Sequence, residues 1–173
     1  MIKKIYRKLQ SFFVSANIKN NFRQITQEDK VLLSQEIKNI YIPTISNNLQ
    51  EEKIFSEIQE HLEDRIYIDR TRVIPWLSKN MNLNNLNILE IGCGTGSSSI
   101  TLAEQGANVV GVDIHKESLQ IAKFRSKIYD LKINFLECSS VDVDKLGNNF
   151  EAIILYATLE HLTFEERIIT LEK

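Results

Sequence analysis

A group of glycines between two carboxylates is the part of the sequence best suited to chemistry. Glu90 is followed by Gly92, Gly94 and Gly96, and Asp113 comes later in the chain. Glycines at alternate positions allow a turn whose backbone takes positive φ angles and approaches a ligand closely. A carboxylate about 20 residues past such a turn is placed to accept hydrogen bonds from the ribose of a nucleotide. The pattern therefore predicts a site for a nucleotide-like cofactor.

The residues around the turn predict the elements that position it. Asn87 to Ile91 is a short apolar run typical of a buried strand, and residues 109–113 form a second such run. Between them we expect a helix that begins at Ser97, where the hydroxyls of residues 97–99 can serve its free N–H groups, and stops at Gly106. Strand, turn, helix and strand in this order predict an α/β fold with a Rossmann-like, doubly wound parallel sheet.

The spacing of the glycines separates two kinds of cofactor. A dinucleotide fingerprint, G-x-G-x-x-G, would need a glycine where the chain has Ser97, so nicotinamide-dependent oxidoreduction is disfavoured. The run Glu90-Ile-Gly-Cys-Gly-Thr-Gly96 instead resembles the first motif, (D/E)-x-G-x-G-x-G, of the class I S-adenosylmethionine-dependent methyltransferases of small-molecule type. The resemblance extends from about Asn87 to the C-terminus. A doubly wound sheet with an empty site is the alternative.

The resemblance implies a site for S-adenosylmethionine. The backbone amides of the glycine turn, with Cys93 among them, would approach the methionine part of the cofactor. Glu90 would lie near its ammonium group, directly or through water. Asp113 would accept hydrogen bonds from both ribose hydroxyls, and Ile114 would lie against the adenine.

Two further positions would complete the cofactor site. The family usually has an acidic residue after the third strand that binds the adenine amino group, and Ser139 or Ser140 stands at that place here. A serine hydroxyl can still accept one hydrogen bond. Tyr156, at the end of the predicted fourth strand, would lie at the junction between cofactor and substrate.

The segment after the fourth strand supplies the candidate catalytic residues. Residues 158–162 read T-L-E-H-L and resemble the v-l-e-H-l segment of many small-molecule methyltransferases. Glu160 and His161 would there supply a general base or orient a hydroxyl; a purely structural hydrogen bond is the other interpretation of the histidine. Methyl transfer from a sulfonium mainly requires alignment of donor and acceptor, so no metal is expected. Cys93 and Cys138 have no zinc-site spacing.

The first part of the chain predicts helices. Residues 1–20 are basic with apolar residues at helical spacing, which indicates an amphipathic helix that contacts a membrane surface or a partner, or simply lies on the domain. Thr26 with Asp29 predicts the start of a second helix, which Pro43 ends.

A further helix is expected just before the first strand. Thr71 would cap it, Pro75 would fall in its first turn, and Trp76 would face inward. In the resembled family this helix commonly covers the cofactor pocket, so Tyr67, Arg70 and Trp76 are expected there. Core packing of the tryptophan and a surface ion pair of the arginine are the alternatives.

The C-terminal part supplies two more strands, at residues 132–136 and 150–157. The chain thus holds strands 1 to 4 of the seven in the resembled fold, and we expect a truncated methyltransferase domain at 81–173 preceded by a helical cap at 1–80. The fourth strand would be an open apolar edge, which a partner chain could cover.

Composition restricts the function classes. A net charge of −2 disfavours a nucleic-acid substrate, and no apolar run approaches the ~20 residues of a membrane span. The two cysteines suit a reducing cytoplasm. The expected function is methyl transfer from S-adenosylmethionine to a small-molecule or glycan-like acceptor. The alternative is a catalytically incomplete module that binds a partner chain or the cofactor without turnover.

Overall fold

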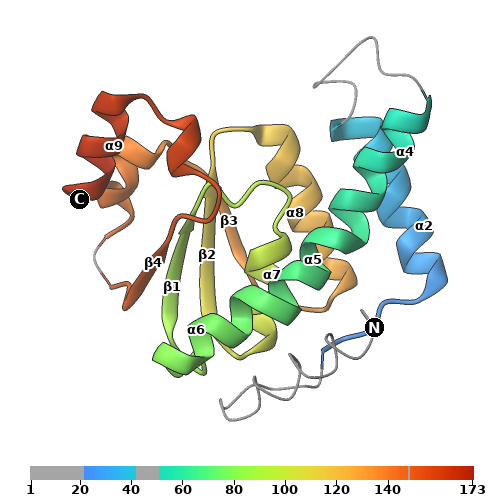
Figure 1. The fold of residues 1–173 in the computed structure, drawn as a ribbon, viewed down its shortest axis with the longest axis horizontal. Helices are drawn as coiled ribbons and strands as arrows, with labels where there is room; N and C mark the ends of the chain where they lie inside the picture. The colour runs from blue at the N-terminus through green and yellow to red at the C-terminus, as the bar shows by residue number, and fades with distance from the viewer. Residues whose placement is uncertain (1–21, 42–50, 148) are drawn as a thin grey trace, which may run out of the picture.

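A parallel four-stranded sheet forms the centre of the molecule (Figure 1). The computed structural model describes residues 22–41, 51–147 and 149–173. The strands are β1 (Asn87–Ile91), β2 (Asn108–Asp113), β3 (Asn134–Glu137) and β4 (Ala152–Ile154), in the order β3-β2-β1-β4. All three pairings are parallel. The strand order reverses between β1 and β4, and ligands of such sheets bind at the carboxyl ends of the strands beside this switch point.

Helices cover both faces of the sheet, which confirms the doubly wound fold. Alternate residues of a strand face opposite sides. On one face Ile88 of β1 packs with Leu102 of α7 (Ser97–Glu104), and α8 (Lys116–Ile128) lies beside α7. On the other face Leu89 packs with Val143 of the 3₁₀ segment η4 (Ser140–Leu146). The last helix, α9 (Phe164–Leu171), contacts η4 on this side (Figure 1).

A helical layer precedes the sheet. It consists of α2 (Gln27–Glu36), which continues as the π-helical turn η1 (Ile37–Tyr41), and of one uninterrupted helical stretch from 51 to 80. That stretch alternates α and π turns in these elements: α4 (Glu51–Gln59), η2 (Glu60–Asp64), α5 (Arg65–Ile68), η3 (Asp69–Val73) and α6 (Ile74–Asn80).

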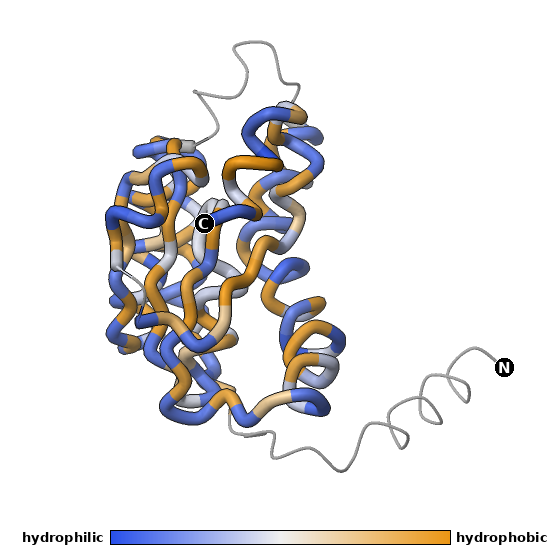
Figure 2. The backbone as a smooth tube through the Cα atoms, turned by 90° about the vertical axis from the view of Figure 1, so that its left-hand side faces the viewer, coloured by the Kyte–Doolittle hydropathy of each residue, from blue (hydrophilic) through white to orange (hydrophobic). Residues whose placement is uncertain are grey.

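The helical layer packs directly on α7 and α8. Leu33 and Leu62 share a buried cluster with Ile121 of α8, and Ile66 is buried with Ile100 of α7. The tube in Figure 2 alternates hydrophobic and hydrophilic residues along these helices, as expected when one face is buried. The described helices before the sheet and the sheet domain share these buried clusters. The division into segments 1–80 and 81–173 therefore stays a prediction.

Local signals placed some helix ends correctly and one wrongly. Thr26 and Asp29 form the predicted capping box at the start of α2, and Gly106, with φ 90°, follows the end of α7. Thr71 is not a helix cap: it lies inside the continuous stretch, and its hydroxyl donates to the Tyr67 carbonyl at 2.6 Å. Pro75 does lie in the first turn of α6, as predicted, although α6 continues directly from the π turn η3.

The sheet differs from the sequence prediction in extent. β4 has only three residues, and β3 begins at Asn134. Within the described residues β4 pairs only with β1, and Ile153 is 51% exposed, as expected of an edge strand. The predicted helix over residues 1–20 and Pro43 fall outside the described residues. In the described part of the chain, no helix combines the length and apolar character needed to cross a bilayer.

Candidate functional site

The glycine turn joins β1 to α7 at the switch point of the sheet. Gly92, Gly94 and Gly96 have φ angles of 76°, 52° and 80°, a region that L-residues with a Cβ rarely adopt. A Cβ atom at Gly92 would also lie 2.4 Å from the hydroxyl oxygen of Thr158, whereas nothing lies within 4 Å of one at Gly94. A Cβ at Gly96 would lie 2.9 Å from the Cβ of Ala122, so the turn needs glycine for conformation at each position and for space at Gly92 and Gly96.

Asp113 lies at the end of β2 and points toward this turn. Its Oδ2 accepts a hydrogen bond from the Gly94 amide at 2.8 Å, and its Oδ1 accepts one from the His115 amide at 2.9 Å. The side chain is 11% exposed. A carboxylate with a partly open face therefore stands beside the turn, as the sequence predicts; its contact with a ribose stays a prediction.

Glu90 lies beneath the turn and is 1% exposed. Both its carboxylate oxygens accept hydrogen bonds, one from the Ser98 hydroxyl and the other from the Ser99 hydroxyl. These serines therefore serve Glu90 and not the free N–H groups at the start of α7, which corrects the sequence prediction. Burial raises the pKa of Glu90 to about 7, although the serine hydrogen bonds act in the opposite direction.

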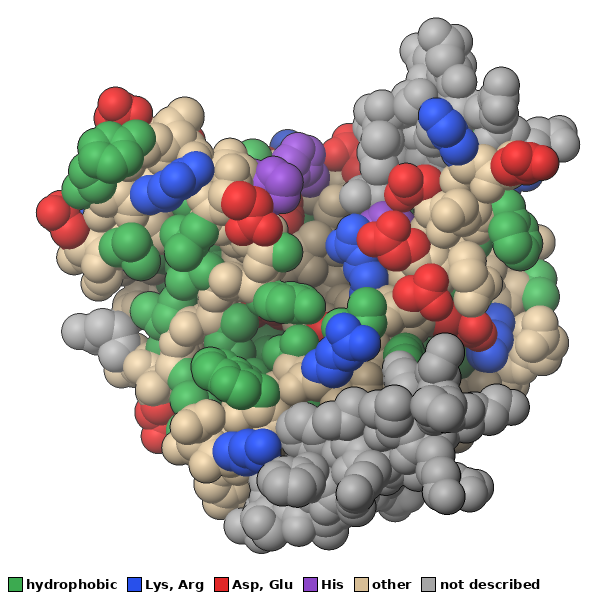
Figure 3. All heavy atoms as spheres, in the orientation of Figure 1, with side chains coloured by type: hydrophobic (Ala, Val, Ile, Leu, Met, Phe, Trp, Pro, Cys, Tyr) green, Lys and Arg blue, Asp and Glu red, His purple; other side chains and the backbone are tan. Residues whose placement is uncertain are grey.

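A cavity of about 340 Å³ opens at the turn. Three walls enclose it: the glycine turn with the start of α7, the helical stretch through α5 and η3, and the loop that follows β4. Figure 3 shows histidine, acidic and basic side chains gathered around a hollow on this face. The loop wall includes Ala157, whose φ of 53° is strained for a residue with a Cβ.

Several predicted residues line the cavity and others lie elsewhere. The cavity is lined by five of them: Gly92, Cys93, Gly94, Tyr156 and His161. The others do not line it: Glu90, Gly96, Asp113, Ile114, Ser139, Ser140 and Glu160. Ile114 is 61% exposed beside the end of β2, and Glu160 is exposed. The buried Ser140 hydroxyl accepts a hydrogen bond from Thr170 of α9 at 2.9 Å, so it also holds that helix in place.

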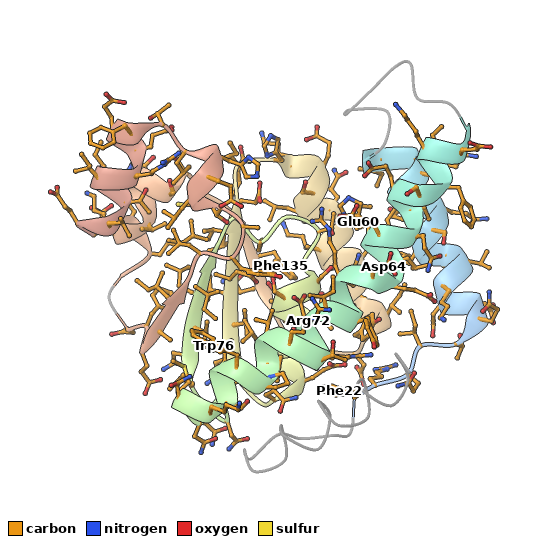
Figure 4. The ribbon with its side chains drawn as sticks, in the orientation of Figure 1. Phe22, Glu60, Asp64, Arg72, Trp76 and Phe135 are labelled. Atoms are coloured by element: carbon orange, nitrogen blue, oxygen red, sulfur yellow. The ribbon has the colours of Figure 1, made fainter. Side chains whose placement is uncertain are left out.

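The helical stretch covers the cavity, but with different residues from those predicted. Tyr67, Arg70 and Trp76 do not line it. Arg70 instead donates to the buried Glu104 carboxylate, with Nε 3.0 Å from Oε2. Trp76 is 64% exposed and does not face inward (Figure 4). The π turns change which residues share a face, so a helix counted from Thr71 gives the wrong orientation.

Arg65 and Asp69, together with Glu60, form the charged part of the helical wall and were missed from the sequence. Arg65 and Asp69 stand four residues apart, a spacing that places both on one helix face. Asp69 is 2% exposed. Burial and the nearby Glu90 raise its pKa to about 7, although the charges of Arg65 and Arg125 act in the opposite direction. The spacing of Arg65 and Asp69 was the available signal in the sequence. Charged pairs with the same spacing are common on solvent-exposed helices, so this pair does not stand out.

A buried arginine supports the turn from below. Arg125 of α8 is fully buried and donates to the Ser97 hydroxyl at 3.2 Å and to the His61 carbonyl. The His61 ring lies 3.2 Å from the Thr95 hydroxyl. Burial and the charges of Arg65 and Arg125 lower the pKa of His61 to about 3. This ring is therefore neutral and ties the helical layer to the glycine turn.

Among the described residues, no three or more His, Cys, Asp or Glu side chains gather closely enough to hold an ion. The described site has a backbone turn, carboxylates at two depths, and Arg65 and His161 in the cavity walls.

Sequence comparisons place the second half of the chain among methyltransferases. Residues 88–173 match the model of a family described as "Methyltransferase domain". The ubiquinone biosynthesis O-methyltransferase of Pelagibacter ubique is 35% identical over 85 residues, which are 49% of this chain and 35% of that protein. The enzyme of the same name from Dechloromonas aromatica is 29% identical over 98 residues, which are 56% of this chain and 42% of that protein. The chain thus spans well under half the length of these relatives.

Structure comparisons give the same fold. The magnesium protoporphyrin IX methyltransferase of Synechocystis, solved with bound SAM, is similar with a TM-score of 0.57 and 22% identity, over 86% of this chain and 71% of that one. A putative S-adenosylmethionine-dependent methyltransferase of Methanococcus maripaludis is similar with a TM-score of 0.58 and 18% identity, over 73% and 60%. At these identities the likeness shows the fold alone.

Proposed function

We propose that the chain binds S-adenosylmethionine at the glycine turn and methylates a small-molecule hydroxyl, because it belongs through residues 88–173 to the class I S-adenosylmethionine-dependent methyltransferases. The observation that carries this proposal is the placement of Asp113. Its carboxylate lies 2.8 Å from the Gly94 amide, at the carboxyl end of β2 and beside the strand switch point.

The residues present fit this cofactor. The open side of Gly94 leaves room for a ligand against the backbone, since no atom lies within 4 Å of a Cβ there. Asp113 would hold the ribose, Cys93 and the turn would face the methionine part, and Ile114 is exposed where adenine would lie. When bound, the cofactor supplies a methyl group already activated on a sulfonium.

The chain would then align the acceptor. His161 lines the cavity wall opposite the helical stretch, so its imidazole is available to take a proton from an acceptor hydroxyl. Glu160 is exposed beside it and would orient the ring or the substrate. Ser139 and Ser140 would lie on the adenine side. The names of the O-methyltransferase relatives support a hydroxyl acceptor on a small molecule; a glycan hydroxyl has the same chemistry.

The second candidate is a module that binds without turnover. It is favoured by the edge of β4, where Ile153 is 51% exposed and the described residues supply no further strand. A partner chain pairing with this edge would complete the sheet. We place either form in the cytoplasm, because a reducing compartment suits its two free cysteines.

Isothermal titration calorimetry tests the proposal. The chain should bind S-adenosylmethionine and S-adenosylhomocysteine and should not bind NAD. Binding of NAD alone, or of none of the three, would contradict it. If the cofactor binds, methyl transfer to small phenols and catechols, followed with radiolabelled donor, separates an enzyme from a binding module.

A further inference from the structure

The helical wall of the cavity holds a carboxylate without a partner. Asp69 lines the cavity and is 2% exposed. Among the described residues, no hydrogen bond or ion pair reaches its oxygens, whereas the nearby Glu90 carboxylate is bonded at both oxygens. A buried carboxylate without a partner is costly, and a ligand that brings a positive charge removes that cost.

We propose that Asp69 binds the α-ammonium group of the methyl donor, and so makes the site specific for a donor with an intact amino-acid end. The inference rests on the proposed function and extends it, because it assigns the ammonium to a residue of the helical layer. The glycine turn and the helical wall face the same cavity, so a donor held by the turn presents its methionine part to Asp69.

Glu90 is less well placed for this contact. Both its oxygens already accept hydrogen bonds from Ser98 and Ser99, and it does not line the cavity. The Glu90 residue is 1% exposed, so an ammonium group in the cavity does not reach its carboxylate directly. Glu90 instead fixes the first turn of α7, while Asp69 faces the space in which the ligand would lie.

The rest of the helical wall suits a group that carries both charges. Arg65 stands one helical turn before Asp69 and lines the same cavity, where its guanidinium donates to Glu60 at 2.9 and 3.0 Å. A positive and a negative side chain on one wall match an amino acid with its carboxylate and ammonium. Arg65 already has Glu60 as its partner, so a ligand that consists of the nucleoside alone would leave only Asp69 without one.

Binding measurements on paired ligands test the assignment. S-adenosylhomocysteine has the amino-acid end, 5′-methylthioadenosine lacks it, and the desamino analogue of S-adenosylhomocysteine lacks only the ammonium. The substitution Asp69→Asn keeps the shape of the side chain and removes its charge. Asp64→Asn is the matched control, because Asp64 is exposed on the same helical stretch and does not line the cavity (Figure 4).

We expect Asp69→Asn to weaken S-adenosylhomocysteine about ten- to a hundredfold in calorimetry. It should leave 5′-methylthioadenosine and the desamino analogue unchanged, and Asp64→Asn should leave all three unchanged. Wild-type protein should bind the desamino analogue about ten- to a hundredfold more weakly than S-adenosylhomocysteine, which tests ammonium recognition without any variant.

Three results would overturn the assignment. They are equal S-adenosylhomocysteine affinity in Asp69→Asn and wild type, an equal loss of all ligands in Asp69→Asn, and equal wild-type affinity for the desamino analogue. If wild-type protein binds 5′-methylthioadenosine but ammonium makes no difference, only this inference fails. If it binds none of the three ligands, the proposed function fails as well.

Discussion

Three carboxylates near one turn differ in their surroundings, and this decides what each can do. Asp113 is partly exposed and accepts from backbone amides. Glu90 is buried and bonded to two serines. Asp69 is buried, faces the cavity and has a raised pKa. The three side chains carry the same chemical group, so their different burial and hydrogen bonding give them separate roles.

Asp113→Asn should weaken S-adenosylhomocysteine binding about ten- to a hundredfold, because the ribose would lose a charged acceptor. Calorimetry at fixed pH and salt measures the effect. Asp130→Asn is the control, since the Asp130 side chain is 88% exposed and its ion pair with Arg23 contributes little. An unchanged dissociation constant in the Asp113 variant would remove the ribose assignment.

Asp69→Asn should change how stability depends on pH. The pKa of Asp69 is about 7 in the folded chain, above the ordinary value of 3.8, so its contribution is fully present below pH 3.8 and is lost as pH rises to 7. Between pH 5 and pH 8 this loss is about 2–3 kcal/mol. The asparagine variant has no carboxylate at this position and does not lose this stability. From pH 5 to pH 8 its free energy of unfolding, relative to that of wild type, should therefore rise by about 2–3 kcal/mol.

Urea unfolding of the ligand-free proteins at the two pH values measures this gain. Glu90 has a raised pKa and gives a slope of the same sign, while His61 has a lowered pKa and loses stability as pH falls from 6.5 toward 3. His61 and the charges of Arg65 and Arg125 remain in the variant, while Glu90 is coupled to Asp69, so the difference between variant and wild type reports the titration of this carboxylate pair. An equal difference between variant and wild type at pH 5 and pH 8 would contradict the prediction.

At the scale of elements, the turn between β1 and α7 combines a backbone requirement with a packing requirement. Thr158, in the loop after β4, donates its hydroxyl to the Ile91 carbonyl at 2.9 Å and so closes that loop over the end of β1. This contact leaves no room for a side chain at Gly92. The loop that carries His161 is therefore positioned by the turn itself.

Gly92→Ala should destabilise the chain more than Gly94→Ala. Both glycines have positive φ, which costs an alanine roughly 1–2 kcal/mol. Only at Gly92 would the new methyl group also meet Thr158, so a further loss of about 1–3 kcal/mol is expected. Thermal and urea unfolding of the two variants provide the comparison. Equal losses would show that the Thr158 contact does not restrict the turn.

At the scale of the whole molecule, a buried arginine joins the helical layer to the sheet domain, in addition to the apolar clusters that they share. Arg125 of α8 reaches the His61 carbonyl in the layer and the Ser97 hydroxyl at the start of α7. The cavity lies where these parts converge, since its walls come from the layer, the turn and the loop after β4. The site thus depends on how the layer docks as much as on the motif.

Arg125→Ala should loosen this docking. The variant leaves buried polar groups without their donor, so a loss of about 1–3 kcal/mol is expected together with faster amide exchange over residues 60–73. Urea unfolding and hydrogen exchange measure the two effects. Arg72→Ala, on the exposed side of the same layer (Figure 4), should change stability by less than about 0.5 kcal/mol. Equal exchange in both variants would contradict the role of Arg125.

The sequence alone predicted the features whose determinants are close together in the chain. The strand at Asn87–Ile91, the glycine turn and Asp113 at the end of β2 follow from hydrophobic periodicity and glycine conformation, and these act over a few residues. The parallel sheet with helices on both faces follows from the alternation of such elements. These predictions did not require knowledge of any distant contact.

Tertiary structure alone decided which side chains meet. Ser98 and Ser99 bond Glu90, Ser140 bonds Thr170, and Trp76 is exposed although its surroundings predicted burial. The cause is that these contacts join distant segments and that each π turn rotates the following residues about the helix axis. Asp69 faces the cavity because of that rotation and the packing of α5 on α7, neither of which is written in a local pattern.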